Sequence, residues 1–300
     1  MGWRLIPAVG LLLLCALSFA ESPSGPVTDP TVVVRRAVAN HFSEEAAHRP
    51  LRFVLHKRDE RHNIIQEIIE TPQGDVAMTV AANGAPLSPE ARQVQITRLD
   101  NLAAHPELQA HRLRREQEDA ARIDKLMRML PDAFIYRYLS TERCNPNRPP
   151  EVAIPGQPKP LSPASAEPPE LCYHMTFTPN PKFSPPDIES RILTGMAGDL
   201  WMEKSDERLY RLNAHLIRDV DFGWGFVGRL DKGGTVFLEQ RDIGGKDWEL
   251  TGMKLDLTGK ILMVKSITIR LTEEIGDFAR VPSNINYREA IRMLLAPVQP

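Results

Sequence analysis

The fold of this chain is decided near its C-terminus by residues 248–271, which read WELTGMKLDLTGKILMVKSITIRL. Apolar and polar residues alternate along most of this stretch, and that period of two is typical of a half-buried β-strand. The apolar residues occupy even positions up to Leu250 and odd positions from Met253 onward, so the phase changes across Thr251 and Gly252. One extra residue in a strand reverses its phase, and the sequence therefore predicts a β-bulge at this point.

Similar alternation is found elsewhere in the chain, from Leu51 to Leu55 and from Tyr210 to Leu216. The isoleucine-rich run from Ile64 to Ile69 also fits helical spacing, but its neighbours favour a strand. Short segments rich in Gly, Asn and Asp predict tight turns between the strands. These expected turns are Asn83–Gly84, Asp231–Gly234, Gly244–Asp247 and Thr258–Gly259.

Four other segments have helical signals: residues 32–42, 88–130, 187–196 and 286–295. The second is a helical insertion that is dense in charge, and it opens with Ser88 as N-cap followed by Pro89. Its acidic and basic residues largely cancel, so we interpret its charged side as a solvated face and expect no nucleic-acid binding.

Consecutive hairpins with one apolar and one polar face predict a single large antiparallel sheet. The predicted fold class is mainly β (α+β), a strongly curved antiparallel sheet or half-barrel covered by a few helices. Residues 31–300 are expected to form one domain, with the charged helical insertion at 88–130 and a proline-rich loop at 145–171.

The N-terminus has the pattern of a signal peptide for export. Arg4 precedes a short apolar run from Leu5 to Leu17, and a small residue, Ala20, stands at the expected cleavage site before Glu21. The run is too short for a membrane-spanning helix, and Leu13 and Leu14 stand where a lipoprotein signal has small residues before its cysteine. We therefore expect residues 1–20 to be removed, residues 21–30 to form a flexible leader, and no transmembrane segment to remain. The expected location is the periplasm, with the exterior as the alternative.

Removal of the signal peptide would leave two cysteines, Cys144 and Cys172, at the two ends of the proline-rich loop. An oxidising compartment favours a disulfide between them, and two unpaired buried thiols are the alternative. His174 is close to Cys172, but no third group near it in sequence would orient the imidazole as a catalytic base. The sequence therefore predicts a disulfide and not a cysteine nucleophile.

No motif for catalysis, nucleotide binding or metal binding is convincing. The glycines from Gly223 to Gly228 lack the strand–loop–helix context of a nucleotide loop. His56 and His62 lie near Asp59 and Glu60 without a recognisable ligand spacing. We therefore expect no catalytic residue, no metal and no cofactor, and the protein is expected not to be an enzyme.

Several longer runs resemble a family of bacterial envelope proteins. They are DLWM at 199–202, RLYRL at 208–212, FGWG at 222–225, GRLDKGG at 228–234 and NGAPLSPE at 83–90. The resemblance extends to the architecture of the superfamily of outer-membrane lipoprotein carriers and sigma-regulator sensors, a curved half-barrel covered by helices. It implies a periplasmic module that cups an acyl chain or a lipid. The charged helical hairpin and the proline-rich loop depart from the smallest carriers.

An apolar sheet face must be covered or used for binding. We expect a ligand groove lined by apolar residues of the C-terminal half, with a lipid or lipoprotein acyl chain as its occupant. The candidate residues are Tyr210, Leu212, Leu216, Phe226, Leu238, Trp248, Leu250, Leu255, Ile267 and Ile269. Two alternatives stay open: a module that binds or senses an envelope protein partner, and a hydrolase whose site assembles from distant residues.

Overall fold

The computed structural model describes residues 29–45, 48–144, 171–222, 228–262 and 265–296. The predicted signal peptide with its cleavage site, the leader up to residue 28 and the proline-rich loop lie outside this part of the chain. The candidate groove residue Phe226 also lies outside it.

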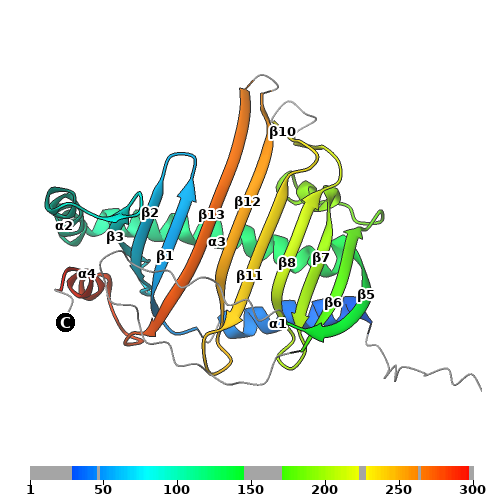
Figure 1. Ribbon diagram of the computed structural model, residues 1–300, viewed down its shortest axis with the longest axis horizontal. Coiled ribbons are helices and arrows are strands. Elements are labelled where there is room, and N and C mark those ends of the chain that lie inside the picture. Colours follow the sequence, from blue (N-terminus) through cyan, green and yellow to red (C-terminus); the bar gives the residue numbers. More distant parts are fainter. Residues whose placement is uncertain (1–28, 46–47, 145–170, 223–227, 263–264, 297–300) are drawn as a thin grey trace, which may run out of the picture.

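All described strands belong to one antiparallel sheet (Figure 1). In chain order they are β1 (Leu51–Asp59), β2 (Asn63–Ile69), β3 (Val76–Ala82), β4 (Ala85–Pro86), β5 (Phe134–Arg143), β6 (Leu171–Pro179), β7 (Met196–Glu203), β8 (Arg208–Leu216), β9 (Val220–Phe222), β10 (Gly228–Leu230), β11 (Thr235–Asp242), β12 (Trp248–Ile261) and β13 (Lys265–Arg280). Their spatial order is β4-β3-β2-β1-β13-β12-β11-β8-β7-β6-β5, and the sheet is not closed into a barrel. The predicted fold class is confirmed.

Two of the predicted hairpins are wrong. Strands β10 and β11 do not pair with each other, because both pair with β12, one after the other along its length. Residues 231–234 therefore do not connect a hairpin. Thr258 and Gly259 lie inside β12. A Cβ on Gly259 would stand 2.2 Å from the carbonyl oxygen of Arg229, so this glycine permits a close approach to β10 and does not mark a turn.

Other local predictions are confirmed. The register between β11 and β12 skips Thr251, which is the predicted bulge. Asn83 and Gly84 both have positive φ, at 53° and 80°, as a tight hairpin turn requires. In the turn after β11 the carboxylate of Asp242 accepts a hydrogen bond from the N–H of Gly244 at 2.8 Å.

The helices are α1 (Pro30–Glu45), α2 (Pro89–Ala104), α3 (Pro106–Ala133) and α4 (Tyr287–Leu295). Ser88 caps α2 by accepting from the N–H of Ala91 at 3.2 Å, and Asn286 and Glu289 form a capping box on α4. The insertion predicted at 88–130 is thus two helices that divide at Pro106. The helix predicted at 187–196 is a 3₁₀-helix, η1 (Glu189–Gly195).

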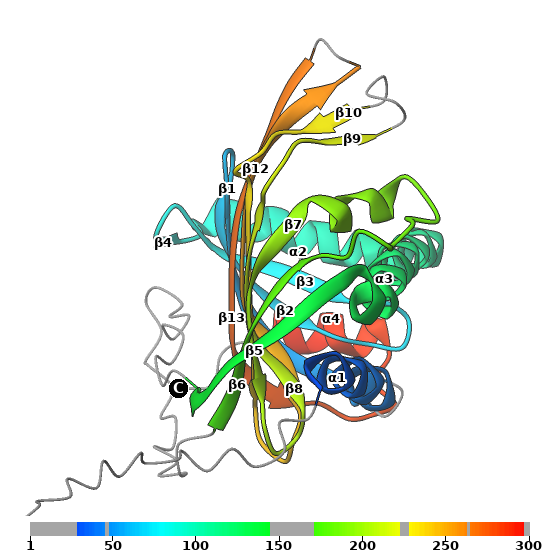
Figure 2. The same ribbon diagram turned by 90° about the vertical axis from the view of Figure 1, so that its right-hand side faces the viewer.

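Figure 2 shows all four helices on one side of the sheet, with α3 crossing behind the strands from β3 to β5 in Figure 1. Among the described residues, no helix is both long and apolar enough to cross a bilayer. The helices form two main packed regions with the sheet. The first, which we call the β5–β8 core, joins α1 and the end of α3 to β5, β6, β7 and β8. The second, the β2–β3 core, joins α2 and α4 to β2 and β3.

Candidate functional site

The sheet register determines which side of the sheet each predicted groove residue faces. Directly paired residues of neighbouring strands point to the same face. One such row consists of Leu200, Leu212 and Leu238. Its first two residues belong to the β5–β8 core, which packs against α1 and the end of α3. The predicted groove residues on this helix-covered face are Leu212, Leu216, Leu238, Leu250, Leu255, Ile267 and Ile269.

Two of the predicted groove residues lie elsewhere. Tyr210 is the extra residue at a bulge between β7 and β8, so its side chain leaves the row. Tyr210 and Trp248 pack instead around the disulfide, in a small cluster with Trp201. Both residues therefore lie apart from the other candidates: a bulge turns Tyr210 out of the row, and Trp248 is the first residue of β12.

The disulfide between Cys144 and Cys172 is present, with the two Cα atoms 5.0 Å apart. It removes the only cysteine beside His174 from nucleophilic chemistry. His174 stacks on Trp201 with ring centroids 4.4 Å apart, and its Nε2 lies 2.9 Å from a carboxylate oxygen of Asp199. These contacts hold the imidazole in a structural role.

The central strands carry apolar residues that remain half-buried. We call this set the central apolar strip, and it lies on the same face of the sheet as the β5–β8 core. Its members are Leu55, Leu238, Met253, Leu255, Leu271 and Ile275. None of them belongs to any of the hydrophobic clusters formed by the described residues. The strip is interrupted by an ion pair between Lys57 and Glu273 at 3.2 Å.

The part of α3 that crosses the central strands belongs to none of the hydrophobic clusters of the described residues, and its Arg122 contacts Glu189 of η1 at 3.8 Å. Every residue from Gln117 to Ile123 is exposed, and Ile123 is 59% exposed. Seven consecutive residues cover all sides of a helix, since one turn takes 3.6 residues. Solvent therefore reaches both the strip and the side of α3 that faces the sheet.

The structure also has a surface hollow of about 810 Å³ on α2. The described residues that line it come from this one helix, on the side away from its buried residues Leu99 and Leu102. They are Pro89, Glu90, Gln93, Val94, Thr97, Arg98 and Asn101. A single helix cannot enclose a ligand, so this hollow is a weaker binding candidate than the strip.

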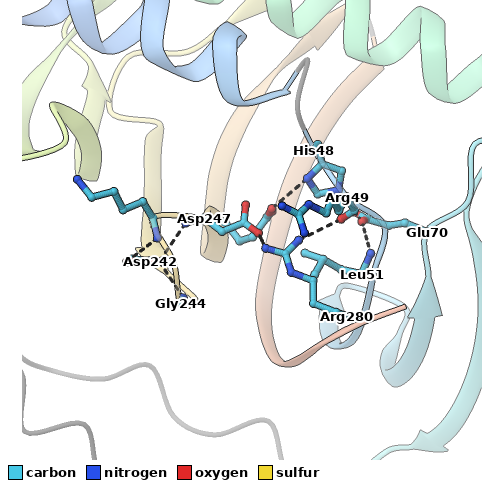
Figure 3. Close-up of polar contacts among 10 residues, drawn as sticks. His48, Arg49, Leu51, Glu70, Asp242, Gly244, Asp247 and Arg280 are labelled. Atoms are coloured by element: carbon cyan, nitrogen blue, oxygen red, sulfur yellow. Dashed lines mark hydrogen bonds and ion pairs between the residues drawn. The ribbon is translucent and has the colours of Figure 1, made fainter. Parts of the chain in front are cut away.

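A second notable group is a cluster of charged residues where several chain segments meet (Figure 3). His48 precedes β1, Glu70 follows β2, Asp247 precedes β12, Glu249 lies within β12 and Arg280 ends β13. The imidazole lies between two carboxylates: Nε2 is 2.7 Å from Glu70 Oε2, and Nδ1 is 3.4 Å from Glu249 Oε1. We call these five residues the His48 cluster.

The carboxylates of the His48 cluster have more than one partner. Glu70 Oε2 also accepts a hydrogen bond from the N–H of Leu51 at 2.8 Å, and Arg280 is paired with Asp247. Burial, together with the nearby charge of Glu70, raises the pKa of Glu249 to about 7. The hydrogen bond to Glu70 raises the pKa of His48.

The sequence gives no sign of the His48 cluster, because its first and last members, His48 and Arg280, are 232 residues apart and the five residues follow no motif spacing. The histidines singled out from the sequence have other contacts: His56 contacts Asn63 at 2.8 Å and Glu274 at 3.4 Å, and His62 contacts Asp59 at 3.0 Å. The His48 cluster could have been predicted only if the neighbouring strands of the sheet had been known.

No protein-family model, no curated protein and no solved structure matches this chain. The features that bear on its function are therefore the central apolar strip and the His48 cluster.

Proposed function

We propose that this protein is a non-enzymatic periplasmic binding protein that holds an acyl chain of a lipid or lipoprotein against the central apolar strip, beneath α3. The observation that carries the proposal is the exposure of two surfaces, the central apolar strip and the middle of α3. Six apolar residues of the strip are only half-buried, while the middle of α3 that crosses them is exposed all round. A folded protein gains free energy by covering such a surface, and a flexible acyl chain would cover it.

The expected affinity follows from the area that would leave water. Burial of each methylene contributes about 0.8 kcal/mol, so a chain of 12 to 16 carbons gains enough to bind without a specific headgroup contact. The ion pair of Lys57 and Glu273 interrupts the strip and would separate Leu55 and Ile275 from the rest of the apolar path. The compartment is part of the proposal, and the disulfide supports an oxidising one.

The test is displacement of a fluorescent fatty-acid probe from the purified protein. Leu255→Glu and Leu271→Glu each place a carboxylate in the strip at a half-exposed position, where the fold should tolerate it. We expect each variant to bind the probe at least 10-fold more weakly, which corresponds to about 1.4 kcal/mol. Circular dichroism verifies that the variants remain folded.

The matched control is Val94→Glu, which places the same charge in the hollow on α2, where Val94 is 64% exposed. It should bind the probe like the wild type. Loss of binding in this variant alone would transfer the site to the hollow, and absence of saturable binding to the wild type would reject the acyl-chain function.

A second candidate function, docking of a protein partner, is favoured by the hairpin of β12 and β13. This hairpin extends beyond the neighbouring strands in Figures 1 and 2. It exposes Ile261, Leu262 and Ile269, at 40%, 68% and 40%. Apolar residues at a projecting tip are typical of protein contacts. If the wild type fails to bind the probe, this hairpin becomes the first surface to test.

A further inference from the structure

Three residues with metal-binding side chains converge in the His48 cluster from distant parts of the sequence. His48, Asp247 and Glu249 each offer one ligand atom, and these atoms lie within 4.8 Å of one another. His48 comes from the connection between α1 and β1, and the two carboxylates come from the start of β12. A set with one imidazole and two carboxylates presents nitrogen and oxygen ligands on one side of a common centre.

The contacts of the His48 ring explain why a cation belongs at that centre. Nε2 is 2.7 Å from Glu70 and donates its N–H to that carboxylate. In the neutral ring the lone pair of Nδ1 then faces Glu249, 3.4 Å away, and a lone pair directed at a carboxylate is repulsive. The arrangement becomes favourable when a proton, on Nδ1 or on Glu249, or a metal ion stands between the two groups.

The separation of the two groups suits a metal ion. Zn²⁺ binds histidine nitrogen and carboxylate oxygen at about 2.0–2.2 Å, and two ligands of a tetrahedral ion at such distances are about 3.4 Å apart. The distance from Nδ1 to Glu249 Oε1 is 3.4 Å. It is long for a charge-assisted hydrogen bond, which is about 2.7–2.9 Å.

We propose that His48, Asp247 and Glu249 bind a divalent transition-metal ion of the zinc class, and that Glu70 is a positioning residue that orients the imidazole. Metal-binding histidines generally donate their other ring N–H to a carboxylate, and Glu70 occupies that place. An imidazole with carboxylates favours Zn²⁺ over Mg²⁺ and Ca²⁺, which prefer oxygen ligands alone. Three protein ligands leave a fourth position open.

The surrounding charges agree with this site. Three carboxylates, those of Glu70, Asp247 and Glu249, lie around one imidazole and the guanidinium of Arg280. The ion pair of Arg208 and Glu44, which is close to neutral as a whole, also acts on Glu249. Arg280 contacts Oδ2 of Asp247 and also donates to the carbonyl of Arg49 at 3.4 Å, so it holds the carboxylate from one side. Binding of the ion would join the segment before β1 to the start of β12.

The experiment is calorimetric titration of the untagged, chelator-treated protein with ZnCl₂, with MgCl₂ as a competitor. The expected result is saturable binding of one equivalent that excess Mg²⁺ does not displace. His48→Ala and Glu249→Gln should each abolish it, and two variants keep the test valid if one of them fails to fold by circular dichroism. Glu70→Gln should retain a site that is 10- to 100-fold weaker, as expected for a positioning residue.

The matched control is His62→Ala, which removes a histidine that also contacts a carboxylate, Asp59, but belongs to no such cluster. It should bind Zn²⁺ like the wild type. Titration with Co²⁺ adds a spectroscopic readout, because a tetrahedral site gives strong visible absorption that His48→Ala should lose. Absence of saturable Zn²⁺ binding, or equal binding by the wild type and His48→Ala, would show that the His48 cluster is an ion-pair network only.

Discussion

Strands β7 and β13 belong to the same sheet and have the same alternation of apolar and polar residues, yet they are packed very differently. In β7, Leu200 and Met202 are buried in the β5–β8 core. In β13, no residue from Lys265 to Arg280 is buried, although Leu271 and Ile275 face the same side of the sheet. The difference lies in the helices: α1 and the end of α3 press on β7, whereas the middle of α3 crosses β13 without packing. Alternation thus shows which residues face a helix layer, but not whether that layer is in contact.

The largest difference in stability between the two regions is expected for alanine substitutions of two glycines, one in β7 and one in β12. A Cβ on Gly198 of β7 would stand 1.9 Å from the backbone oxygen of Asn213, whereas a Cβ on Gly252 of β12 would meet its nearest atom, in the Phe237 side chain, at 3.6 Å. Gly198→Ala should lower the free energy of unfolding by more than about 3 kcal/mol, because backbone atoms would have to move. Gly252→Ala should change it by less than about 1 kcal/mol. Urea denaturation measures both, and equal effects would contradict the contrast between the two regions.

A matched pair of leucines sharpens the comparison. Leu200→Ala removes a side chain that is 4% exposed and should cost about 3 kcal/mol, through lost transfer energy and a cavity. Leu271→Ala removes the same atoms from a half-buried position and should cost about 1 kcal/mol, because little cavity is left. The same denaturation measurement applies. A cost for Leu271→Ala as large as that for Leu200→Ala would mean that the centre of the sheet is as tightly packed as its end.

A smaller effect is expected at Asp75, where the turn before β3 meets the N-terminal part of α3. Burial raises the pKa of Asp75 to about 7, and the nearby carboxylates of Glu70 and Glu116 contribute to the shift. In the unfolded chain the Asp75 carboxyl loses its proton near its ordinary pKa of 3.8. The stability that the protonated form supplies is therefore present below pH 4 and is lost as the pH rises to about 7.

Asp75→Asn should therefore stabilise the protein at pH 8 by about 2 kcal/mol and have little effect at pH 4, since the amide cannot ionise. Thermal unfolding at the two pH values measures the difference. Asp100→Asn, at an exposed position of α2, is the control and should have no effect at either pH. A destabilising Asp75→Asn at pH 8 would show that the ionised carboxylate is needed in the fold.

Much of the fold could be predicted because its signals are local. Alternation identified the long strands, and Ser88 with Pro89 marked the start of a helix. The phase change at Thr251 predicted a bulge, and the register contains it. The cysteine pair was also predictable, since only two cysteines would follow a cleaved signal peptide.

The failures occurred where the partner of a segment decides its structure. Both Gly233 and Gly259 were expected in hairpin turns, but Gly233 lies in a turn between two strands that pair with the same neighbour, and Gly259 lies within a strand. Glycine permits a tight turn and a close backbone approach equally well, and only the neighbouring strand determines which occurs. Tyr210 was placed in the groove by alternation, and a bulge opposite Trp201 turned it away.

The sequence by itself therefore determined the secondary structure, the antiparallel sheet and the disulfide, because each depends on residues a few positions apart or on a pair with no competitor. The tertiary structure alone decided which half of the sheet the helices cover and which charged groups meet. The central apolar strip exists because α3 is held at its two ends and not in its middle. The His48 cluster exists because the start of β12 is brought beside the connection that precedes β1. Both depend on contacts between distant segments, and such contacts follow from the packing of the whole sheet.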